Sequence, residues 1–309
     1  MTNFIDSEYA TLIGHLLHDT RYIEISNMGK MAGLRKHAEV LVRKILDIGN
    51  DSMLTLGEVR NKSKNKFVKD GMIALGEELS CRLIEITNRI NPLGSAGTHT
   101  QHTDNFSDEE IAQVEDAILD LYAMIFIKFF VKYPIGLDFS PVILREFSIL
   151  PPIIRFKTWS YLYDKDKKNV QVVNKLCLSI IKTFDKQTAY KWLKENSKDI
   201  KEIPYPTDSE IEQYVLSRAV EVAPGQYAIS LDLDIDQYDN IYDLLYAKIN
   251  DKRTSINESG KLYSTFEGAL EHYNKHGKMD VLYASEEEIE FFSLMEFVYI
   301  GRQPIEKEM

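Results

Sequence analysis

The segment between residues 106 and 132 is the feature that most constrains what this chain can fold into. Ser107 is a good helix N-cap, and Glu110 completes a capping box with it. Phe106 and Ile111 flank that box and suit a hydrophobic staple. Apolar residues then recur at helical spacing, at Val114, Ala117, Ile118, Leu121, Ile125 and Phe129. A long helix with such an apolar face has to pack against others, so we predict a helical bundle.

Apolar spacing of the same kind extends this bundle over residues 1–135. It predicts further helices at residues 5–18, 28–48 and 67–90. Pro134 and Gly136 break the helical pattern, so the first domain boundary is placed there. Residues 136–205 are predicted to form a helical connecting segment, with a long helix at 168–196.

The last third, residues 206–309, has a different pattern and predicts an acidic α+β domain. Residues 219–223 and 226–233 alternate in the manner of strands, and Pro224-Gly225 between them is a hairpin signal. The spacing also predicts helices and strands further on: helices near 238–250, 263–275 and 285–292, and strands at 279–283 and 296–300. The predicted fold class is therefore α+β, mainly α.

One segment between two predicted helices, residues 87–102, carries residues suited to phosphate chemistry. Arg89 is expected to leave the end of a helix, and His99 and His102 follow a turn that contains Gly94. Arginine matches phosphate oxygens with a planar permanent charge, and histidine exchanges a proton near pH 7. The alternative interpretation is a polar loop whose histidines face water.

The helix expected at residues 34–46 adds a second element of the same pattern. Arg35, Glu39 and Arg43 are four residues apart and share one helical stripe. This order, an R-x3-E-x3-R helix followed by a glycine turn and a histidine-bearing loop, resembles the HEPN superfamily of prokaryotic helical domains. The likeness is to the branch found beside restriction and abortive-infection genes, and it covers roughly residues 28–132.

The resemblance implies roles for particular residues. It makes Arg89 the family arginine and His99 the family histidine, with His102 as the other candidate. Nuclease members usually place the histidine closer to the arginine, whereas nine residues stand between Arg89 and His99 here. The branch often has Gly-Asn at the turn, and this chain has Gly94-Ser95. HEPN nucleases pair two such loops across a homodimer, so the resemblance implies a dimer.

A dense basic run at residues 60–69 is a second candidate contact for phosphate. It holds five basic side chains in ten residues, including Lys62, Lys64 and Lys66. These lysines are candidates to hold an RNA or nucleotide backbone, and Asn88 is a candidate to orient a phosphate. A solvated loop at the start of a helix explains the same run without any function.

The charge distribution bears on the partners. The net charge of −11 argues against a broadly basic nucleic-acid coat. Residues 1–135 carry 15 basic and 19 acidic side chains, residues 136–205 carry 13 and 8, and residues 206–309 carry 9 and 21. The acidic last third is a possible docking face for a partner protein, or it serves solubility alone. A homodimer is expected through the N-terminal bundle, whose apolar face at 125–131 exceeds what one short bundle needs to bury.

The remaining composition favours a cytoplasmic protein without a metal or cofactor. Cys81 and Cys177 have no metal-ligand spacing around them, and we expect each to be a buried thiol in a reducing compartment. The pair His272 and His276 has no evident third ligand. The most apolar run, residues 121–131, contains a lysine and is too short to span a bilayer.

Two functions follow from these observations. The first is a non-catalytic sensing or scaffolding module of a prokaryotic anti-phage, abortive-infection or toxin system, which binds a partner protein, a nucleotide or RNA. The second is a metal-independent endoribonuclease with a composite site in a dimer. In that case His99 or His102 would transfer the proton, and Arg89 would stabilise the charge on the transferring phosphate.

Overall fold

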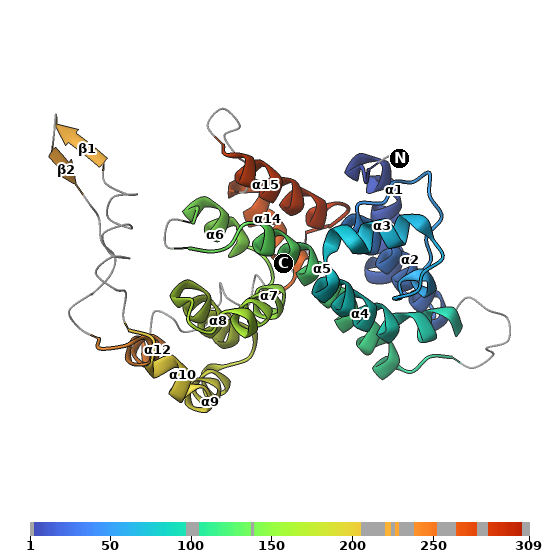
Figure 1. Cartoon of the computed structure of the whole chain (residues 1–309). Coiled ribbons are helices and arrows are strands. Elements are labelled where there is room, and N and C mark those ends of the chain that lie inside the picture. The colour runs from blue at the N-terminus through green and yellow to red at the C-terminus, as the bar shows by residue number, and fades with distance from the viewer. Residues whose placement is uncertain are drawn as a thin grey trace. The chain divides into compact units, whose positions relative to one another are not determined.

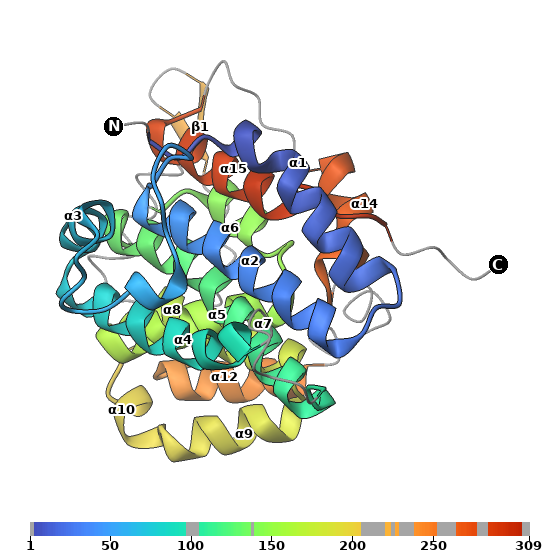
Figure 2. The same cartoon turned by 90° about the vertical axis from the view of Figure 1, so that its right-hand side faces the viewer.

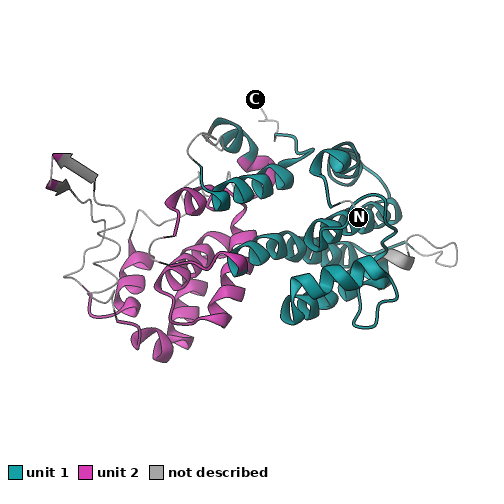
Figure 3. Cartoon of the chain, turned by 45° about the horizontal axis from the view of Figure 1, so that its top comes forward, with its two compact units in different colours: residues 1–131, 270–309 teal, residues 132–269 magenta. Residues whose placement is uncertain are grey.

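The structure is a computed structural model, and it describes eight stretches of the chain (Figure 1): residues 3–96, 105–136, 139–204, 220–223, 226–228, 238–251, 264–276 and 284–304. The described part is mainly helical, as predicted. Its contacts divide the chain into two compact units (Figure 3). Unit 1 comprises residues 1–131 and 270–309, and unit 2 comprises residues 132–269.

Unit 1 is a bundle of helices built around α5. Its elements are α1 (Asp6–Leu17), the π-helix η1 (His18–Tyr22), α2 (Asn27–Leu46), the 3-10 helix η2 (Leu56–Glu58), α3 (Lys66–Leu75), α4 (Glu77–Ala96), α5 (Asp108–Lys132), the second half of α14 (Phe266–His276) and α15 (Glu286–Tyr299). Within the bundle, α2 packs against α1, α3 and α4. The prediction of helices over residues 1–135 is confirmed for the part that the structure describes.

The start of α5 confirms the predicted capping box. The Ser107 backbone N–H donates to Glu110 Oε2 at 2.9 Å, and the Glu110 N–H donates to Ser107 Oγ at 3.2 Å. Phe106 and Ile111 on either side of the box are both buried. The two unsatisfied donors at this helix end are therefore paired as the sequence pattern indicates.

The helix predicted at residues 67–90 is two helices, α3 and α4, and the second is longer than expected. Gly76 separates them with φ of 88°, a conformation that glycine adopts without a Cβ clash. The second helix, α4, continues past Arg89 to Ala96 and contains Pro92. The prediction that Arg89 leaves the end of a helix is therefore wrong, because Pro92 is accommodated within α4 and does not end it.

The last helix, α15, covers the apolar face of α5. The ring of Phe291 lies 5.9 Å from that of Phe126, 5.2 Å from Phe129 and 6.4 Å from Phe130, measured between centroids. The surplus apolar face expected at residues 125–131 is thus largely buried within unit 1, although Val131 stays 48% exposed. Helix α15 of the same chain therefore packs on this apolar face of α5.

This packing changes two expectations for the C-terminal third. The strand predicted at residues 296–300 is wrong, because α15 continues through Tyr299. Aromatic and apolar residues line several sides of this buried helix and hide its helical period. Residues 270–309 also group with residues 1–131, whereas the sequence placed all of 206–309 in one domain.

The chain after α15 is fixed to the first helix by a close backbone approach. Figure 2 shows α15 beside α1, and Gly301 lies against Gly14 there. Gly301 has φ of 71°, and a Cβ built on it would come within 2.6 Å of Gly14 Cα. Only glycine fits this contact without moving the backbone.

Unit 2 is also helical. Its elements are α6 (Pro141–Phe147), α7 (Pro152–Lys165), α8 (Val170–Thr183), α9 (Lys186–Glu195), α10 (Ser197–Lys201), β1 (Val220–Ala223), β2 (Gln226–Ala228), α12 (Ile241–Asn250) and the first residues of α14. The helix predicted at 168–196 is two helices, since Asp185 caps α9 by accepting from the Thr188 N–H at 2.6 Å. The helices predicted near 238–250 and 263–275 are confirmed as α12 and α14.

The two short strands pair antiparallel on either side of the predicted hairpin. Val220 faces Ala228, and Glu221 faces Tyr227. Pro224 and Gly225 themselves lie outside the described residues, as does the strand predicted at 279–283. The small α+β unit expected over residues 206–309 is therefore not shown and remains a prediction.

Two further findings concern the classes considered above. Within the described stretches, no helix combines the length and the apolar character that crossing a membrane requires. Cys177 is buried as expected, and burial raises the pKa of its thiol to about 12. Cys81 is exposed, so the expectation that both thiols are buried is wrong for this residue.

Candidate functional site

The predicted site arginine, Arg89, lies within α4 and is held by two carboxylates of α5. Its Nη1 donates to Asp120 Oδ2 and its Nη2 donates to Asp116 Oδ2, both at 2.5 Å. Asp116 and Asp120 are one helical turn apart, so they project from the same stripe of α5. Two carboxylates around one guanidinium give the cluster a formal charge of −1.

The three side chains differ in their exposure to solvent. The Arg89 side chain is 44% exposed and Asp116 is 47% exposed, whereas Asp120 is only 10% exposed. Partial burial opposes the charged form of Arg89, but the hydrogen bonds to Asp116 and Asp120 outweigh it and raise the pKa of the guanidinium. The pair with Asp120 is therefore the more protected half of the contact.

The surrounding charges of α2 and α5 are compensated in the same way. Lys30 Nζ lies 3.1 Å from Glu115 Oε1, beside the Arg89 contact in sequence. Arg35 Nε lies 3.5 Å from Glu39 Oε1 within α2. In both of these contacts a cation of α2 is paired with a carboxylate.

The third residue of the arginine–glutamate stripe, Arg43, has a structural role at the end of α2. Its Nη1 donates to the Gly49 carbonyl and its Nη2 donates to the Ser52 carbonyl, each at 2.7 Å. These bonds satisfy carbonyl oxygens in the turn that follows the helix. The stripe that supports the HEPN resemblance thus forms ion pairs and caps a turn in this structure.

The other predicted site residues are placed as follows. Asn88 is exposed on α4, next to Arg89 but on a different side of the helix. Lys62 and Lys64 are exposed in the loop before α3, and Lys66 is exposed in its first turn. Nothing in the structure brings these lysines to the Arg89 contact. The two candidate histidines, His99 and His102, lie outside the described residues.

A buried polar chain, which the sequence interpretation missed, joins α2, α5 and the C-terminal segment. Arg302 Nη2 donates to the Tyr122 hydroxyl at 2.8 Å. That hydroxyl lies 2.9 Å from His37 Nε2 and donates to it, because the arginine side can only donate. All three residues are at most 7% exposed.

This polar chain holds His37 in its neutral form. Burial lowers the pKa of His37 to about 3, and the charges of Arg302 and Arg21 act in the same direction. Its position on the buried face of α2 between Leu34 and Leu41 was the available sequence signal. No local pattern could have shown that Arg302 joins this chain, because it lies 180 residues from Tyr122, to which it donates.

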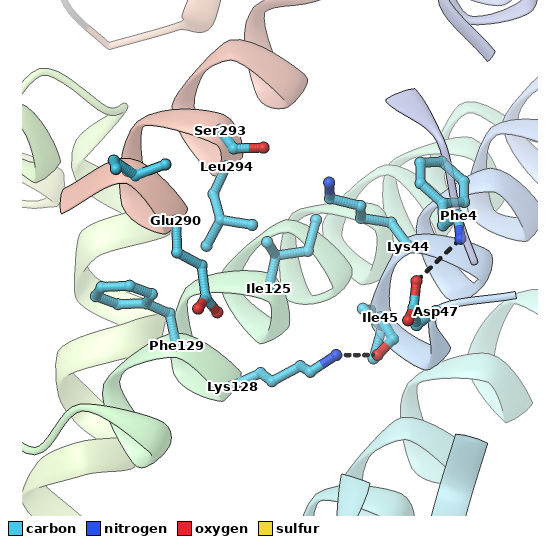
Figure 4. Close-up of a pocket in the computed structure, with 11 residues that line it drawn as sticks. Phe4, Lys44, Ile45, Asp47, Ile125, Lys128, Phe129, Glu290, Ser293 and Leu294 are labelled. Carbon is cyan, nitrogen blue, oxygen red and sulfur yellow. Dashed lines mark hydrogen bonds between the residues drawn. The ribbon is translucent and has the colours of Figure 1, made fainter. Parts of the chain in front are cut away.

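Unit 1 also contains a pocket of about 260 Å³ between α2, α5 and α15 (Figure 4). Four charged side chains line it, two cationic and two acidic: Lys44, Lys128, Asp47 and Glu290. Lys44 Nζ donates to Asp6 at 2.6 Å, and Lys128 Nζ donates to the Ile45 carbonyl at 2.8 Å. The two positive and two negative side chains balance, and both lysines already donate hydrogen bonds within the protein. The lining of the pocket therefore favours neither an anionic nor a cationic ligand.

The structure therefore brings Arg89 together with carboxylates and not with the predicted phosphate-binding residues. Among the described residues, no group of three or more histidine, cysteine, aspartate or glutamate side chains is arranged to hold a metal ion. Comparisons of the chain with protein-family models, with curated proteins and with solved structures give no match.

Proposed function

We propose that this protein is a HEPN-like helical module of a prokaryotic anti-phage, abortive-infection or toxin system. In this proposal it is a non-catalytic cytoplasmic sensor or scaffold that binds a partner protein, a nucleotide or RNA. The HEPN part rests on the resemblance of residues 28–132. The observation that favours a non-catalytic role is the contact of Arg89 with Asp116 and Asp120.

This contact matters because a catalytic arginine has to direct its donors at the transferring phosphate. Stabilisation of a developing charge depends on donors that are already aimed at it and not used elsewhere. Two donors of Arg89 are directed at carboxylates, and the cluster carries a net negative charge. A phosphate would have to separate both charge-assisted pairs and approach two like charges, which opposes binding in the transition state.

The alternative, a metal-independent endoribonuclease, keeps one supporting observation. The Arg89 side chain is 44% exposed, and α4 leads directly into the segment that holds His99 and His102.

A dimer through the N-terminal bundle belongs to both proposals and rests on the resemblance alone, since α15 already covers much of the apolar face that suggested it. The acidic last third remains the proposed docking face for a partner protein.

A cleavage assay on the full chain separates the two functions. Single-stranded RNA would be incubated with the wild type, Arg89→Ala, His99→Ala and His102→Ala in the presence of EDTA. The non-catalytic proposal expects intact RNA in every sample. Cleavage by the wild type that is lost in Arg89→Ala and in one of the histidine variants would contradict it and establish the nuclease.

A control is needed because Arg89→Ala removes the contact that Arg89 makes with the buried Asp120 and could disturb the fold. Arg60→Ala removes the same charge from an exposed loop position outside the α4–α5 contact. Circular dichroism melts of both variants would show whether a loss of cleavage reflects a loss of fold. A nuclease in which Arg60→Ala and Arg89→Ala lose activity equally would show electrostatic binding and not catalysis by Arg89.

A further inference from the structure

The pocket between α2, α5 and α15 has a polar end and an apolar end. In the view of Figure 4, Lys44, Asp47 and Phe4 lie on one side of it, and Phe129 and Leu294 lie on the other. All of its lining residues belong to unit 1. Its volume of about 260 Å³ is below the range of roughly 300–1,000 Å³ typical of sites for drug-sized ligands, so it suits a smaller molecule.

The polar end is held together by Phe4. The Phe4 backbone N–H donates to Asp47 Oδ1 at 2.9 Å, and Lys44 Nζ lies 5.5 Å from the centroid of the Phe4 ring. Lys44 belongs to the last turn of α2, and Asp47 caps that helix with φ of 55°. Both polar groups are therefore fixed beside the same residue.

The ammonium group of Lys44 keeps donors that the protein does not use. The Lys44 side chain is only 15% exposed, and its Nζ donates to Asp6 Oδ1 at 2.6 Å. It also lies over the rings of Phe4 and Phe297, at 5.5 and 4.9 Å from their centroids. An ammonium group has three donors, and among the described residues Asp6 is its only hydrogen-bond acceptor. Asp6 compensates the charge, while donors remain for an uncharged acceptor.

The carboxylate of Asp47 keeps an acceptor in the same way. Its Oδ1 accepts from the Phe4 N–H, and no described residue donates to its Oδ2. The other two charges of the lining, Lys128 and Glu290, are opposite in sign and add no net charge. The polar end therefore offers one donor and one acceptor to a ligand without selecting a charged one.

The apolar end suits a flat hydrophobic group. Ile125, Phe129 and Leu294 supply apolar lining there. Ile289 lines the same pocket and is 49% exposed, so a ligand would cover apolar surface that now faces water. Two of the lining side chains, Phe4 and Phe129, are aromatic, and aromatic pairs gain more than their buried area alone provides.

We propose that this pocket binds a small, uncharged aromatic molecule whose polar edge carries a carbonyl oxygen beside an N–H group. The carbonyl would accept from Lys44, and the N–H would donate to Asp47. Aromatic carboxamides and heteroaromatic rings that contain an amide present this edge. A carboxylate ligand would instead place a like charge against Asp47, and an amidinium ligand would place one against Lys44, which opposes the binding of either.

This binding site goes beyond the proposed function. It takes a small molecule, and it is completed by Phe4 and α15, which lie outside the HEPN-like residues 28–132. It uses neither Arg89 nor the two candidate histidines. The outcome of the RNA cleavage assay therefore does not bear on it.

The test uses probes of matched shape on the full chain. Benzamide is uncharged, benzoate is its anionic counterpart and benzamidine is its cationic counterpart. Cyclohexanecarboxamide keeps the amide and replaces the aromatic ring. Dissociation constants would be measured by ligand-observed NMR titration. Benzamide is expected to bind at least fivefold more tightly than each of the other three.

The variant Asp47→Asn tests the polar edge. Asparagine tolerates the left-handed backbone and can still accept from the Phe4 N–H, but its amide nitrogen takes the place of the unused oxygen. Benzamide should bind at least fivefold more weakly, whereas benzoate should bind more tightly because the like charge is gone. Asp70→Asn makes the same change at an exposed position of α3 outside the pocket, and it should alter both constants less than twofold.

A second variant tests the place of binding without the polar edge. Ser293 lines the pocket, and its hydroxyl makes no hydrogen bond to a described residue, so Ser293→Phe removes no such bond and fills the space. It should abolish benzamide binding while its melting temperature stays close to that of the wild type.

Four results would overturn the proposal. Benzamide could fail to bind the wild type at millimolar concentrations, or a charged counterpart or cyclohexanecarboxamide could bind as tightly. A folded Ser293→Phe could keep the wild-type affinity for benzamide. Asp47→Asn could leave the order of benzamide and benzoate unchanged. Equal losses of benzamide binding in Asp70→Asn and Asp47→Asn would show that the effect does not come from the pocket.

Discussion

The Arg89 contact and the buried polar chain of Arg302, Tyr122 and His37 place an arginine in two different settings within unit 1. In unit 1, the one arginine that the motif singled out is surrounded by two carboxylates and has a negative balance. In the buried polar chain, by contrast, Arg302, which no motif singled out, is 7% exposed and donates to the Tyr122 hydroxyl. The comparison teaches that a candidate anion site is judged by its local charge balance and not by the presence of a basic residue.

The titration of His37 in the buried polar chain gives the largest expected effect. His37 has a folded pKa of about 3, below its usual value near 6.5. Below pH 6.5 the unfolded chain therefore binds a proton that the folded chain does not bind. Stability from this group is complete above pH 6.5 and is lost as the pH falls towards 3, at about 1.4 kcal/mol per pH unit.

The variant His37→Gln tests this expectation, because glutamine can still accept from Tyr122 and does not titrate. Urea unfolding of both proteins would be compared at pH 7 and pH 4. The wild type should lose about 3 kcal/mol more than the variant over this interval. Parallel losses would mean that His37 takes up its proton in the folded state and would contradict its lowered pKa.

The more buried half of the Arg89 contact gives the next largest effect. Asp120→Asn replaces a charge-assisted bond at a side chain that is only 10% exposed, so it should lower the free energy of unfolding by about 1–3 kcal/mol. Chemical denaturation at neutral pH measures the loss. Glu115→Asn is the control, since its pair with Lys30 is more exposed and should contribute less than about 1 kcal/mol.

How far the sequence predicts the fold is seen by comparing α5 with α15. The capping box and the apolar period of α5 are local signals, and the structure confirms both. In α15 the capping box at Ser285 is equally clear, but aromatic residues near its end indicated a strand. The packing of Phe291 on three phenylalanines of α5 decided the outcome, and such contacts between distant segments have no local signal.

The candidate site shows the same limit. The sequence pattern places Arg89 at the end of a helix, whereas α4 continues past it to Ala96. It does not indicate that Asp116 and Asp120 face Arg89, because this depends on the register between α4 and α5.

Removing the half-buried charge of Lys175 on α8 gives a smaller effect of opposite sign. Lys175→Met should raise the free energy of unfolding by about 0.5–1 kcal/mol at pH 7, because a half-buried charge that faces other cations is replaced by an apolar chain. The lowered pKa means that the wild type gains stability as the pH rises towards 10.5, so the difference should shrink there. Lys191→Met, which lies on an exposed face, should change stability little.

The opposite result for Lys175→Met would contradict this expectation. If Lys175→Met is less stable than the wild type by 1 kcal/mol or more, the Lys175 ammonium group has a stabilising partner in the folded protein. The measurement would be thermal unfolding in a buffer without phosphate, since a bound anion would stabilise the wild type and hide the repulsion.

The smallest effect is expected at the exposed half of the Arg89 contact. Asp116 is 47% exposed, and exposed ion pairs contribute little, so Asp116→Asn should lower the free energy of unfolding by less than about 1 kcal/mol. The charge of the cluster nevertheless changes from −1 to 0, and one face of the guanidinium is released. Inorganic phosphate should then raise the melting temperature of Asp116→Asn slightly more than that of the wild type, whereas Asp120→Asn should lose more stability. If Asp116→Asn proves the more damaging of the two, burial does not rank these carboxylates, and the assignment of Asp120 as the principal partner of Arg89 fails.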